Sequence, residues 1–316
     1  MSNIKHYFNN MIFFQHSLGY ELKYLHSTLE ELDSFYDKYY PELDTLTKES
    51  VEEWIYHIKT QSRHVLSQRV TTIKRLGTYL NSIGIEAYVP NYGVSLGPHK
   101  CILLFDENQL SRFFDGADCI NRHLRSPHRE YIVPVVFRLI YSCGLRNSEA
   151  CNIKVEHIDF ETGRIDIYHS KGDKDRSVFM DDSMKELCIK FNTLYSMVLP
   201  NREYFFQPSY QKTHLTKYNI GDHFDRILKI TGLDKELPIK PTVHGLRHLF
   251  AVKSMKKCLC LGGDFGNWIK YLSQYMGHES AKETMYYLHM VEALIPEYRI
   301  KMKSLTEGIG VVHEED

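Results

Sequence analysis

The sequence lacks the features that would place this chain in a membrane or in a fold held by disulfides. No apolar run reaches the length of about eighteen residues that a membrane-spanning helix needs. The first residues lack the charged and then apolar layout of a secretory signal. Seven cysteines are scattered through 316 residues, and an odd, scattered set favours reduced thiols over a disulfide framework. We therefore expect a cytoplasmic protein that does not associate with membranes.

Metal-ligand spacing is also missing from the sequence. Cys258 and Cys260 lie too close together for half of a zinc site, and no second pair has the required spacing. Charged residues make up 25% and hydrophobic residues 43% of the chain, so a packed core is feasible. The length suits two domains. We expect a globular protein with no bound metal.

The chain has little net charge, −1 in total, which argues against a nucleic-acid binder because such proteins are often strongly basic. The distribution of charge is more informative than the sum. The first fifty residues are rich in acid, whereas the stretch between Glu53 and Glu86 contains no acid. Basic residues occupy that stretch: Arg63, Arg69, Lys74 and Arg75. Such segregation fits a DNA-facing surface, and a solvated helix face explains it equally well.

Hydrophobic spacing predicts helices through the first third of the chain. Helix-like spacing runs from residue 18 to about 81, with a helix over 51–58 capped by Ser50 and another over 67–83 that Gly84 ends. Turn residues follow, and they place a domain boundary between about residues 89 and 105. We expect an all-helical domain over residues 1–95.

The remainder of the chain predicts a second, mainly helical domain. A helix is expected near residues 106–116, and Ser126 is placed to cap another helix that has Pro127 at its first position. Alternating residues near 164–168 and 177–180 predict two strands joined by a turn. The expected fold is therefore mainly α, with a small antiparallel β-sheet in the domain of residues 105–300 and a tail over 301–316.

Several basic residues and histidines have the chemistry needed to break and rejoin a phosphodiester without a metal. That reaction needs a nucleophile, cations over the non-bridging oxygens and a proton donor for the leaving oxygen. Arginine suits the second task because its planar fork grips phosphate. Arg146 follows an apolar helix, and Glu149 lies three residues on, where it can hold the guanidinium. Taken alone, Arg146 fits a surface arginine at a helix end better.

The other candidates are a turn lysine and the histidine-rich segment near the end of the chain. Lys171 lies at the tip of the predicted hairpin, where a lysine chosen for solubility is the commoner case and Lys174 is a rival for the role. His244 and Arg247 are three residues apart, which puts them on one helix face, and a capping histidine with an unrelated arginine is the alternative.

A tyrosine is the candidate nucleophile. Tyr287 follows His278 by nine residues, so it can reach the same pocket. The chain has 22 tyrosines, and an ordinary core aromatic is the simplest explanation of any one of them. Spacing alone does not choose Tyr287 over Tyr286, Tyr275 or Tyr271.

These motifs, taken in order, resemble a known family. The chain contains Gly-Leu-Arg-x-x-Glu over 144–149, Lys-Gly-x-Lys-x-Arg over 171–176, His-x-Leu-Arg-His over 244–248, then Gly-His and a tyrosine nine residues on. Their order and spacing resemble the tyrosine recombinases, also called phage-type integrases, from about residue 105 to 290. Within this family, the sequence most resembles transposon-borne or Xer-like members without an arm-binding domain, because its helical pattern begins close to the first residue.

The resemblance implies a role for each matching residue. Arg146 and Arg247 would hold the scissile phosphate, with Glu149 supporting Arg146. Lys171 would protonate the leaving 5′ hydroxyl. Neither a cofactor nor ATP nor a metal is implied.

The same resemblance assigns the histidines and the nucleophile. His244 would contact the phosphate or take part in proton transfer, and His278 would hold a phosphate oxygen. Tyr287 would be the nucleophile, because its distance from His278 matches the family and that of Tyr286 does not. His248 directly follows Arg247 on the same helix, so its side chain points elsewhere, and we interpret it as structural.

The implied activity is site-specific recombination of double-stranded DNA through a 3′-phosphotyrosyl intermediate, with integration or excision of a mobile element as its task. Four copies would close on DNA as clamps and exchange strands through a Holliday junction. An accessory DNA-bending or directionality factor is left open, as is whether residues 291–305 dock on their own subunit or on a neighbour. The alternatives are DNA relaxation of the type IB topoisomerase kind and a catalytically inactive DNA-binding protein.

Overall fold

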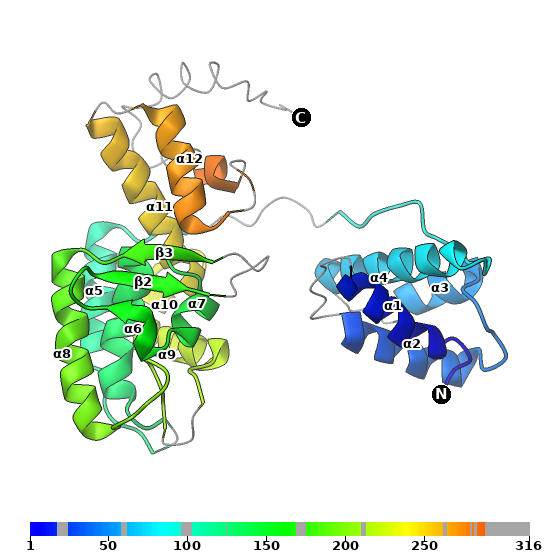
Figure 1. The fold of residues 1–316 in the computed structure, drawn as a ribbon, viewed down its shortest axis with the longest axis horizontal. Helices are drawn as coiled ribbons and strands as arrows, with labels where there is room; N and C mark the ends of the chain where they lie inside the picture. The colour runs from blue at the N-terminus through cyan, green and yellow to red at the C-terminus, as the bar shows by residue number, and fades with distance from the viewer. Residues whose placement is uncertain are drawn as a thin grey trace. The chain divides into compact units, whose positions relative to one another are not determined.

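The computed structural model describes residues 1–17, 25–57, 62–95, 103–124, 126–168, 175–209, 213–261, 264–278, 280 and 283–287 (Figure 1). The chain divides into two compact units, residues 1–101 and 102–316. Each unit has a hydrophobic core of its own.

The regular elements in the described part of the first unit are all helices. Its elements are α1 His6–Ser17, α2 Leu25–Tyr39, α3 Lys48–Tyr56 and α4 Arg63–Ser82. Helix α4 packs against the other three helices. Its apolar positions Val70, Ile73, Leu76 and Leu80 are all buried in the shared core, as their helical spacing predicts.

Two helices of this unit begin at residues other than those expected from the sequence. Helix α3 is capped by Thr47, whose side chain accepts from the Ser50 amide, so Ser50 is the third helical residue and not the cap. Helix α4 starts at Arg63 rather than at residue 67, because the side chain of Ser62 caps it by accepting from the Val65 amide. N-cap positions prefer hydroxyl side chains. Because several neighbouring residues carry a hydroxyl, this preference alone does not identify which of them caps the helix.

The structure contradicts the interpretation of Arg69 as a DNA-contacting residue. Its side chain is only 5% exposed. The guanidinium donates to the Trp54 carbonyl at 2.9 Å and to the Glu31 carboxylate at 3.2 Å, and it lies 4.8 Å from the centre of the Trp54 ring. Arg69 therefore ties α2, α3 and α4 together inside the unit. By contrast, Arg63 is exposed on α4, and Lys74 and Arg75 are partly exposed.

Replacing Arg69 by alanine should destabilise the first unit by about 2 kcal/mol or more, because it removes the shorter of two hydrogen bonds to the Trp54 carbonyl and opens a cavity beside Trp54. Urea unfolding followed by the fluorescence of Trp54, in a Trp268→Phe background, measures this loss. The matched control is Arg63→Ala, an exposed arginine of the same helix, which should change stability by less than about 0.5 kcal/mol. Equal effects of the two changes would contradict the buried role of Arg69.

The second unit is mainly helical and contains one small sheet. Its helices are α5 Glu107–Asp118, α6 Arg129–Cys143, α7 Asn147–Asn152, α8 Asp182–Val198, α9 Lys217–Thr231, α10 Leu233–Glu236, α11 Val243–Cys260 and α12 Phe265–Met276, with the short 3-10 helix η1 Val155–His157. Its strands are β1 Ile158–Asp159, β2 Arg164–Ile167 and β3 Arg176–Phe179. The expectation of a mainly α fold with a small antiparallel sheet is confirmed.

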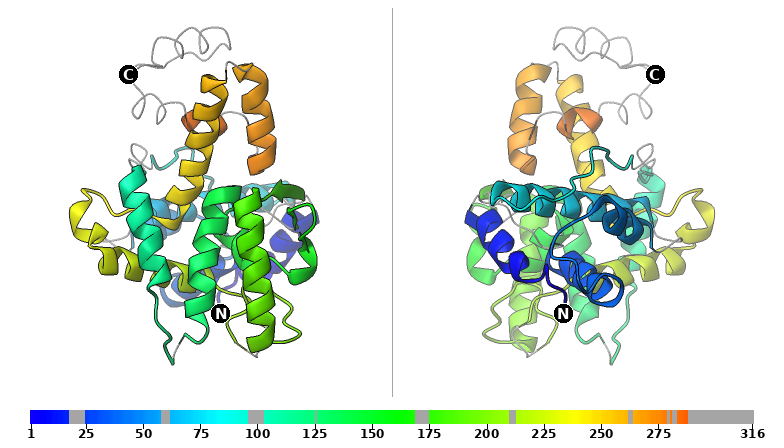
Figure 2. Two further views of the ribbon diagram at one scale, coloured as in Figure 1. Left: turned by 90° about the vertical axis from the view of Figure 1, so that its left-hand side faces the viewer. Right: turned by 90° about the vertical axis from the view of Figure 1, so that its right-hand side faces the viewer.

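Helix α6 is the centre of this unit. It packs against α5, α8 and α11, and its Ile, Val, Leu and Phe residues are buried. Figure 2 shows α5, α6 and α8 side by side, with α11 continuing beyond this layer and α12 beside it. The sheet has the order β1-β2-β3 and is antiparallel, with Ile165 opposite Val178 at the centre of the β2–β3 pair. Helix α12 contacts both α11 and β3, so the sheet, α11 and α12 converge on one place.

The start of α6 differs from the sequence prediction. Helix α5 begins close to the expected residue 106, with Asp106 as its cap, but Ser126 does not cap a helix. Its hydroxyl lies 3.2 Å from the His223 ring, and α6 begins only at Arg129, after His128 in a left-handed conformation with φ 65°. Pro127 therefore belongs to the turn before the helix.

No helix in the described part of the chain is both long and apolar enough to cross a membrane. Among the same residues, no three His, Cys, Asp or Glu side chains gather in a way that would hold a metal ion. The six cysteines that fall within the described ranges are free thiols.

Candidate active site

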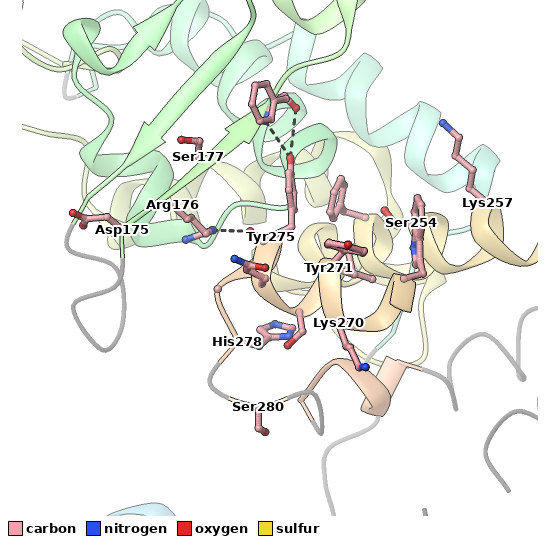
Figure 3. Close-up of a pocket in the computed structure, with 17 residues that line it drawn as sticks. Asp175, Arg176, Ser177, Ser254, Lys257, Lys270, Tyr271, Tyr275, His278 and Ser280 are labelled. Carbon is pink, nitrogen blue, oxygen red and sulfur yellow. Dashed lines mark hydrogen bonds between the residues drawn. The ribbon is translucent and has the colours of Figure 1, made fainter. Parts of the chain in front are cut away.

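The candidate site forms where four segments far apart in the sequence meet. They are the start of α7, the first residue of β3, the first two turns of α11, and the end of α12 with the helical turn of residues 283–287. Figure 3 shows part of this place, with Arg176 reaching from β3 toward α12 and His278 just beyond the helix end. A pocket lined by α12, the later turns of α11 and β3 opens beside it.

One buried carboxylate organises two of the arginines. Glu149 is 6% exposed, and it accepts from the backbone amide of Arg146 at 2.7 Å and from the Arg146 guanidinium at 2.8 Å. Arg176 donates to both of its oxygens, at 2.8 and 2.7 Å. Arg247 lies slightly farther away, at 3.8 Å. The bidentate geometry is the strong form of the arginine–carboxylate contact, so Glu149 fixes α7 and β3 against each other.

The last carbonyls of α12 are the second acceptor for these arginines. Arg176 donates through Nε to the Tyr275 carbonyl at 2.7 Å, Arg247 donates to the Met276 carbonyl at 2.5 Å, and Arg146 donates to the Gly277 carbonyl. Carbonyls at a helix C-terminus have no partner within the helix and carry its negative dipole end. Three consecutive carbonyls thus each receive a different guanidinium.

Glycine is required at two points of this arrangement. Gly277 ends α12 with φ 65°, and a Cβ there would lie 3.1 Å from an Arg176 nitrogen and 3.3 Å from an Arg146 nitrogen. Gly144 ends α6 with φ 63°, and a Cβ there would meet the Phe250 ring at 2.4 Å. Left-handed backbone favours glycine at both helix ends. The close approach of the arginines to the α12 end therefore depends on the missing side chain of Gly277.

Arg247 is the most deeply buried of the three arginines, with 1% of its surface exposed. Besides Met276 it donates to the Gly144 carbonyl at 2.7 Å, while its Nε has no hydrogen-bond partner. Burial lowers the pKa of its guanidinium to about 10, although the nearby Glu149 acts in the opposite direction. At this pKa the Arg247 guanidinium is still fully charged at neutral pH. Its Nε–H group remains available to a further acceptor.

The hydroxyl of Tyr287 lies within this group of charges. Its side chain is 3% exposed, and the oxygen is 2.8 Å from Nδ1 of His248. Burial raises the pKa of the phenol, and the positive charge of Arg247 opposes that shift. The Tyr287 ring also stacks on the ring of His278 at 6.1 Å with an angle of 20°. The hydroxyl is thus held between an imidazole and a guanidinium, out of contact with bulk water.

Two further histidines complete the group. His244 precedes Arg247 by one turn of α11 and lies edge to face on His248 at 4.3 Å. His244 keeps exposed surface, yet the protein mass around it removes part of its hydration, which lowers its pKa together with the charges of Arg247 and Arg146. Nδ1 of His278 lies 2.7 Å from the hydroxyl of the buried Thr284. That contact joins the end of α12 to the turn that carries Tyr287.

The structure brings together most of the residues that the sequence singled out for catalysis. Those in one cluster are Arg146, Glu149, His244, Arg247, His278 and Tyr287. Lys171 and its rival Lys174 lie outside the described residues, as does the segment 291–305, so the roles expected for them stay predictions.

Two members of the cluster were not singled out by the sequence. Arg176 ends the hairpin motif, but nothing in the sequence shows that it shares the carboxylate of Glu149 with Arg146. His248 was interpreted as structural because it directly follows Arg247 on a helix and so points in another direction. In the structure its ring contacts the Tyr287 hydroxyl. Each is the last residue of a motif that resembles the family, Arg176 in the motif over 171–176 and His248 in the motif over 244–248. That position in the motifs is the signal that could have found both.

The competing tyrosines have other surroundings. Tyr271 is 71% exposed on α12. Tyr275 stacks on Phe250 at 5.6 Å, and its hydroxyl accepts from the Phe179 amide at 3.3 Å, as the dashed lines of Figure 3 show. Tyr286 is partly exposed, next to Tyr287. The Tyr287 hydroxyl, by contrast, lies against a histidine of the cluster and close to the positive charge of one of its arginines.

Comparison with known proteins agrees with this geometry. Residues 105–293, more than half of the chain, match the model of the phage integrase family. The chain belongs to the phage integrase family. The resemblance to tyrosine recombinases is thereby confirmed, and this recombinase is a DNA strand-transfer enzyme, as its family is.

Individual relatives extend the match beyond the second unit. A tyrosine recombinase of Pseudothermotoga lettingae is 26% identical over 259 residues, covering 79% of this chain and 80% of the relative. Tyrosine recombinase XerA of Saccharolobus solfataricus is 29% identical over 268 residues, covering 82% and 80%. The fold is similar to that of the Tn1549 transposon integrase solved in complex with transposon right end DNA, with a TM-score of 0.63, 15% identity and coverage of 91% and 94%.

Removing the carboxylate of Glu149 should strongly destabilise the second unit of the recombinase, by about 3 kcal/mol or more, because charged guanidinium groups would stay buried without their counter-ion. Urea unfolding of Glu149→Ala, followed by Trp268 fluorescence in a Trp54→Phe background, measures the change. Glu156→Ala is the control, since Glu156 is 74% exposed, and it should be nearly neutral. A loss for Glu149→Ala below about 1 kcal/mol would contradict the organising role of this residue.

Two histidines of the site, the buried His248 and the partly buried His278, should make the recombinase sensitive to acid. Burial lowers the pKa of His248 and of His278 to about 3 each, whereas both return to about 6.5 on unfolding. The unfolded state therefore binds more protons below pH 6.5, and stability falls as the pH drops from 6.5 toward 3, by up to about 1.4 kcal/mol per pH unit for each histidine.

Unfolding in urea at pH 7, 6 and 5 measures this slope. His248→Asn removes one of the titrating groups, so its stability should fall less steeply with acid than that of the unchanged recombinase. The exposed His6, in the first unit, supplies the control His6→Asn. A slope that His248→Asn leaves unchanged would contradict the depressed pKa.

Proposed function

We propose that this recombinase cuts and rejoins double-stranded DNA at specific sites, with Tyr287 as its nucleophile and a 3′-phosphotyrosyl link as its intermediate. The observation that supports this most is the position of the Tyr287 hydroxyl. It lies against His248 at 2.8 Å and under the influence of Arg247, within a cluster that also holds Arg146 and His278. An isolated core tyrosine would not need such partners.

The chemistry follows from the charges of the cluster. The Tyr287 oxygen attacks the phosphorus, the bond from phosphorus to the 5′ oxygen breaks, and negative charge grows on the non-bridging oxygens. Preorganised cationic donors are the most effective way to stabilise such charge. We assign this task to Arg146 and Arg247, and the protonation of the leaving 5′ oxygen to Lys171, as the family resemblance implies.

The free donors of Arg247 support its phosphate-binding role. A guanidinium has five N–H groups, and the contacts to the Gly144 and Met276 carbonyls occupy two of them. Its Nε lies buried without a partner. A buried donor without an acceptor is costly, and an anionic phosphate oxygen would relieve that cost. The same phosphate would find His244 and His278 as further neutral donors.

Rejoining needs no external energy source. The phosphotyrosyl bond conserves the energy of the broken phosphodiester, and attack by the 5′ hydroxyl of a second strand reverses the first step. We propose that four copies carry out two such exchanges through a Holliday junction, in the cytoplasm, for integration or excision of a mobile element. The integrase that shares this fold was solved with transposon DNA, which supports the choice of substrate.

DNA contacts are proposed for both units. Residues 105–300 would form the catalytic domain and residues 1–95 a core-binding domain, with 301–316 as a tail. In the core-binding domain, Arg63, Lys74 and Arg75 keep exposed surface on α4 and are placed to meet phosphates, which would make binding depend on salt concentration. Arg69 is not among them, because its guanidinium is used inside the unit.

The test is covalent capture on DNA that flanks the gene. Nicked duplex fragments of that DNA should trap a protein–DNA adduct that survives denaturation, in the presence of EDTA and without ATP. Tyr287→Phe should abolish the adduct, because it removes only the attacking oxygen. Tyr286→Phe is the matched control and should retain it. Mapping the trapped fragment gives the cleavage position.

Other outcomes would favour other functions. An adduct that persists in Tyr287→Phe and disappears in Tyr286→Phe would overturn the assignment of the nucleophile. Relaxation of supercoiled plasmid by single copies, with no assembly on DNA, would indicate a topoisomerase-like activity. Tight DNA binding with no adduct under any condition would indicate a DNA-binding protein without catalysis.

A further inference from the structure

His248 makes the most direct contact with the reacting atom of any described residue outside the set assigned above. It lies on α11 and is 7% exposed, its Nδ1 is 2.8 Å from the Tyr287 oxygen, and the two ring centres are 5.1 Å apart. A phenol needs a proton acceptor to become a nucleophile near neutral pH, since its ordinary pKa is about 10. The group that contacts the phenol hydroxyl is therefore the candidate for this proton acceptor.

The direction of this hydrogen bond can be argued from the neighbouring charges. Burial and the charges of His244, Arg247 and His278 lower the pKa of His248 to about 3, so its ring is neutral. A neutral imidazole has one N–H and one free lone pair. Because the positive charge of Arg247 lies close to the Tyr287 oxygen, the phenol proton points away from it, toward Nδ1. Nε2 then carries the imidazole hydrogen.

We propose that His248 is a catalytic residue of this recombinase, the general base that takes the phenol proton of Tyr287 through Nδ1 during attack. The inference rests on the proposed function, because it concerns the strand-cleavage step. As the Tyr287 oxygen forms its bond to phosphorus, its O–H bond breaks and the proton moves to Nδ1, which leaves an imidazolium. The electron pair of the broken phosphorus–oxygen bond leaves on the 5′ oxygen, which Lys171 protonates.

The resting site opposes that proton transfer, and the bound phosphate favours it. The charged groups facing the pair are Arg247 on α11, Arg146 at the start of α7 and Glu283 in the turn that carries Tyr287. While DNA is absent, burial and the neighbouring charges disfavour a positive charge on the His248 ring. A phosphodiester brings one negative charge, and the transition state adds a second. The base thus becomes effective only when the scissile phosphate is in place.

Asparagine separates the basic role of His248 from a purely orienting one. The Oδ1 atom of Asn can stand where Nδ1 stands and accept the phenol hydrogen, but it cannot take up the proton. The matched control is His223→Asn. His223 is also a buried histidine, 3% exposed, but it lies on α9, with Ser126 as its neighbour.

The single-turnover cleavage rate is measured on the nicked duplex identified by covalent capture, between pH 6 and 9.5. At pH 7 we expect His248→Asn to cleave about 100-fold or more slowly, the usual contribution of a general base. Its rate should then rise about tenfold per pH unit as hydroxide replaces the base, while His223→Asn stays within about twofold of the unchanged recombinase. A rate for His248→Asn within about threefold at pH 7, or a slow rate with an unchanged pH profile, would overturn the proposal.

A second measurement needs no DNA and keeps the two proposals separable. Nitrogen-15 NMR of histidine-labelled protein reports which ring nitrogen of His248 carries the hydrogen, with His248→Asn identifying the signal. We expect an unprotonated Nδ1 at pH 7. Protonated Nδ1 would show that His248 donates to Tyr287, and the base role would be excluded even if Tyr287 forms the adduct. Absence of any adduct with the unchanged protein would instead refute the proposed function.

Discussion

The site depends on a single shared carboxylate. Glu149 is buried, and it accepts hydrogen bonds from Arg146 and Arg176 while Arg247 lies at 3.8 Å. Guanidinium groups at such close range repel one another, and their removal from water costs several kcal/mol each. The buried negative charge offsets part of both costs, which allows α7, β3 and α11 to approach. Without it, the buried guanidinium groups would repel one another with no counter-charge beside them.

The end of α12 shares this task, and this links the site to the stability of the fold. Its carbonyls at Tyr275, Met276 and Gly277 need donors, and the arginines need acceptors. Each side satisfies the other, so the same contacts that hold the arginines in place also cap the helix. A bound phosphate therefore enters a site whose geometry is already set, and it uses the donors that the carbonyls leave over. That is the condition under which charged groups stabilise a transition state efficiently.

The sequence predicts those parts of the structure that depend on nearby residues. Helix α5 begins close to the expected residue 106, and the spacing of Arg146 and Glu149 anticipates their contact. Prediction fails where a residue's surroundings come from other elements. Arg69 belongs to a basic stretch, but Trp54 and Glu31 enclose it. His248 follows Arg247 directly, and only the position of Tyr287, brought in by a later turn, gives its ring a catalytic neighbour.

Overall charge hides the electrostatics of such a site. The net charge of −1 gives no sign of DNA binding, because acids and bases cancel when summed over the whole chain. Within the site, three arginines and one glutamate leave a local excess of two positive charges, and the histidines stay neutral through burial. Phosphate responds to the field within about one Debye length, ~8 Å at physiological salt, so the local excess governs it and the distant acids do not. Neutral histidines suit this arrangement, since they add hydrogen-bonding groups without adding repulsion between the cations.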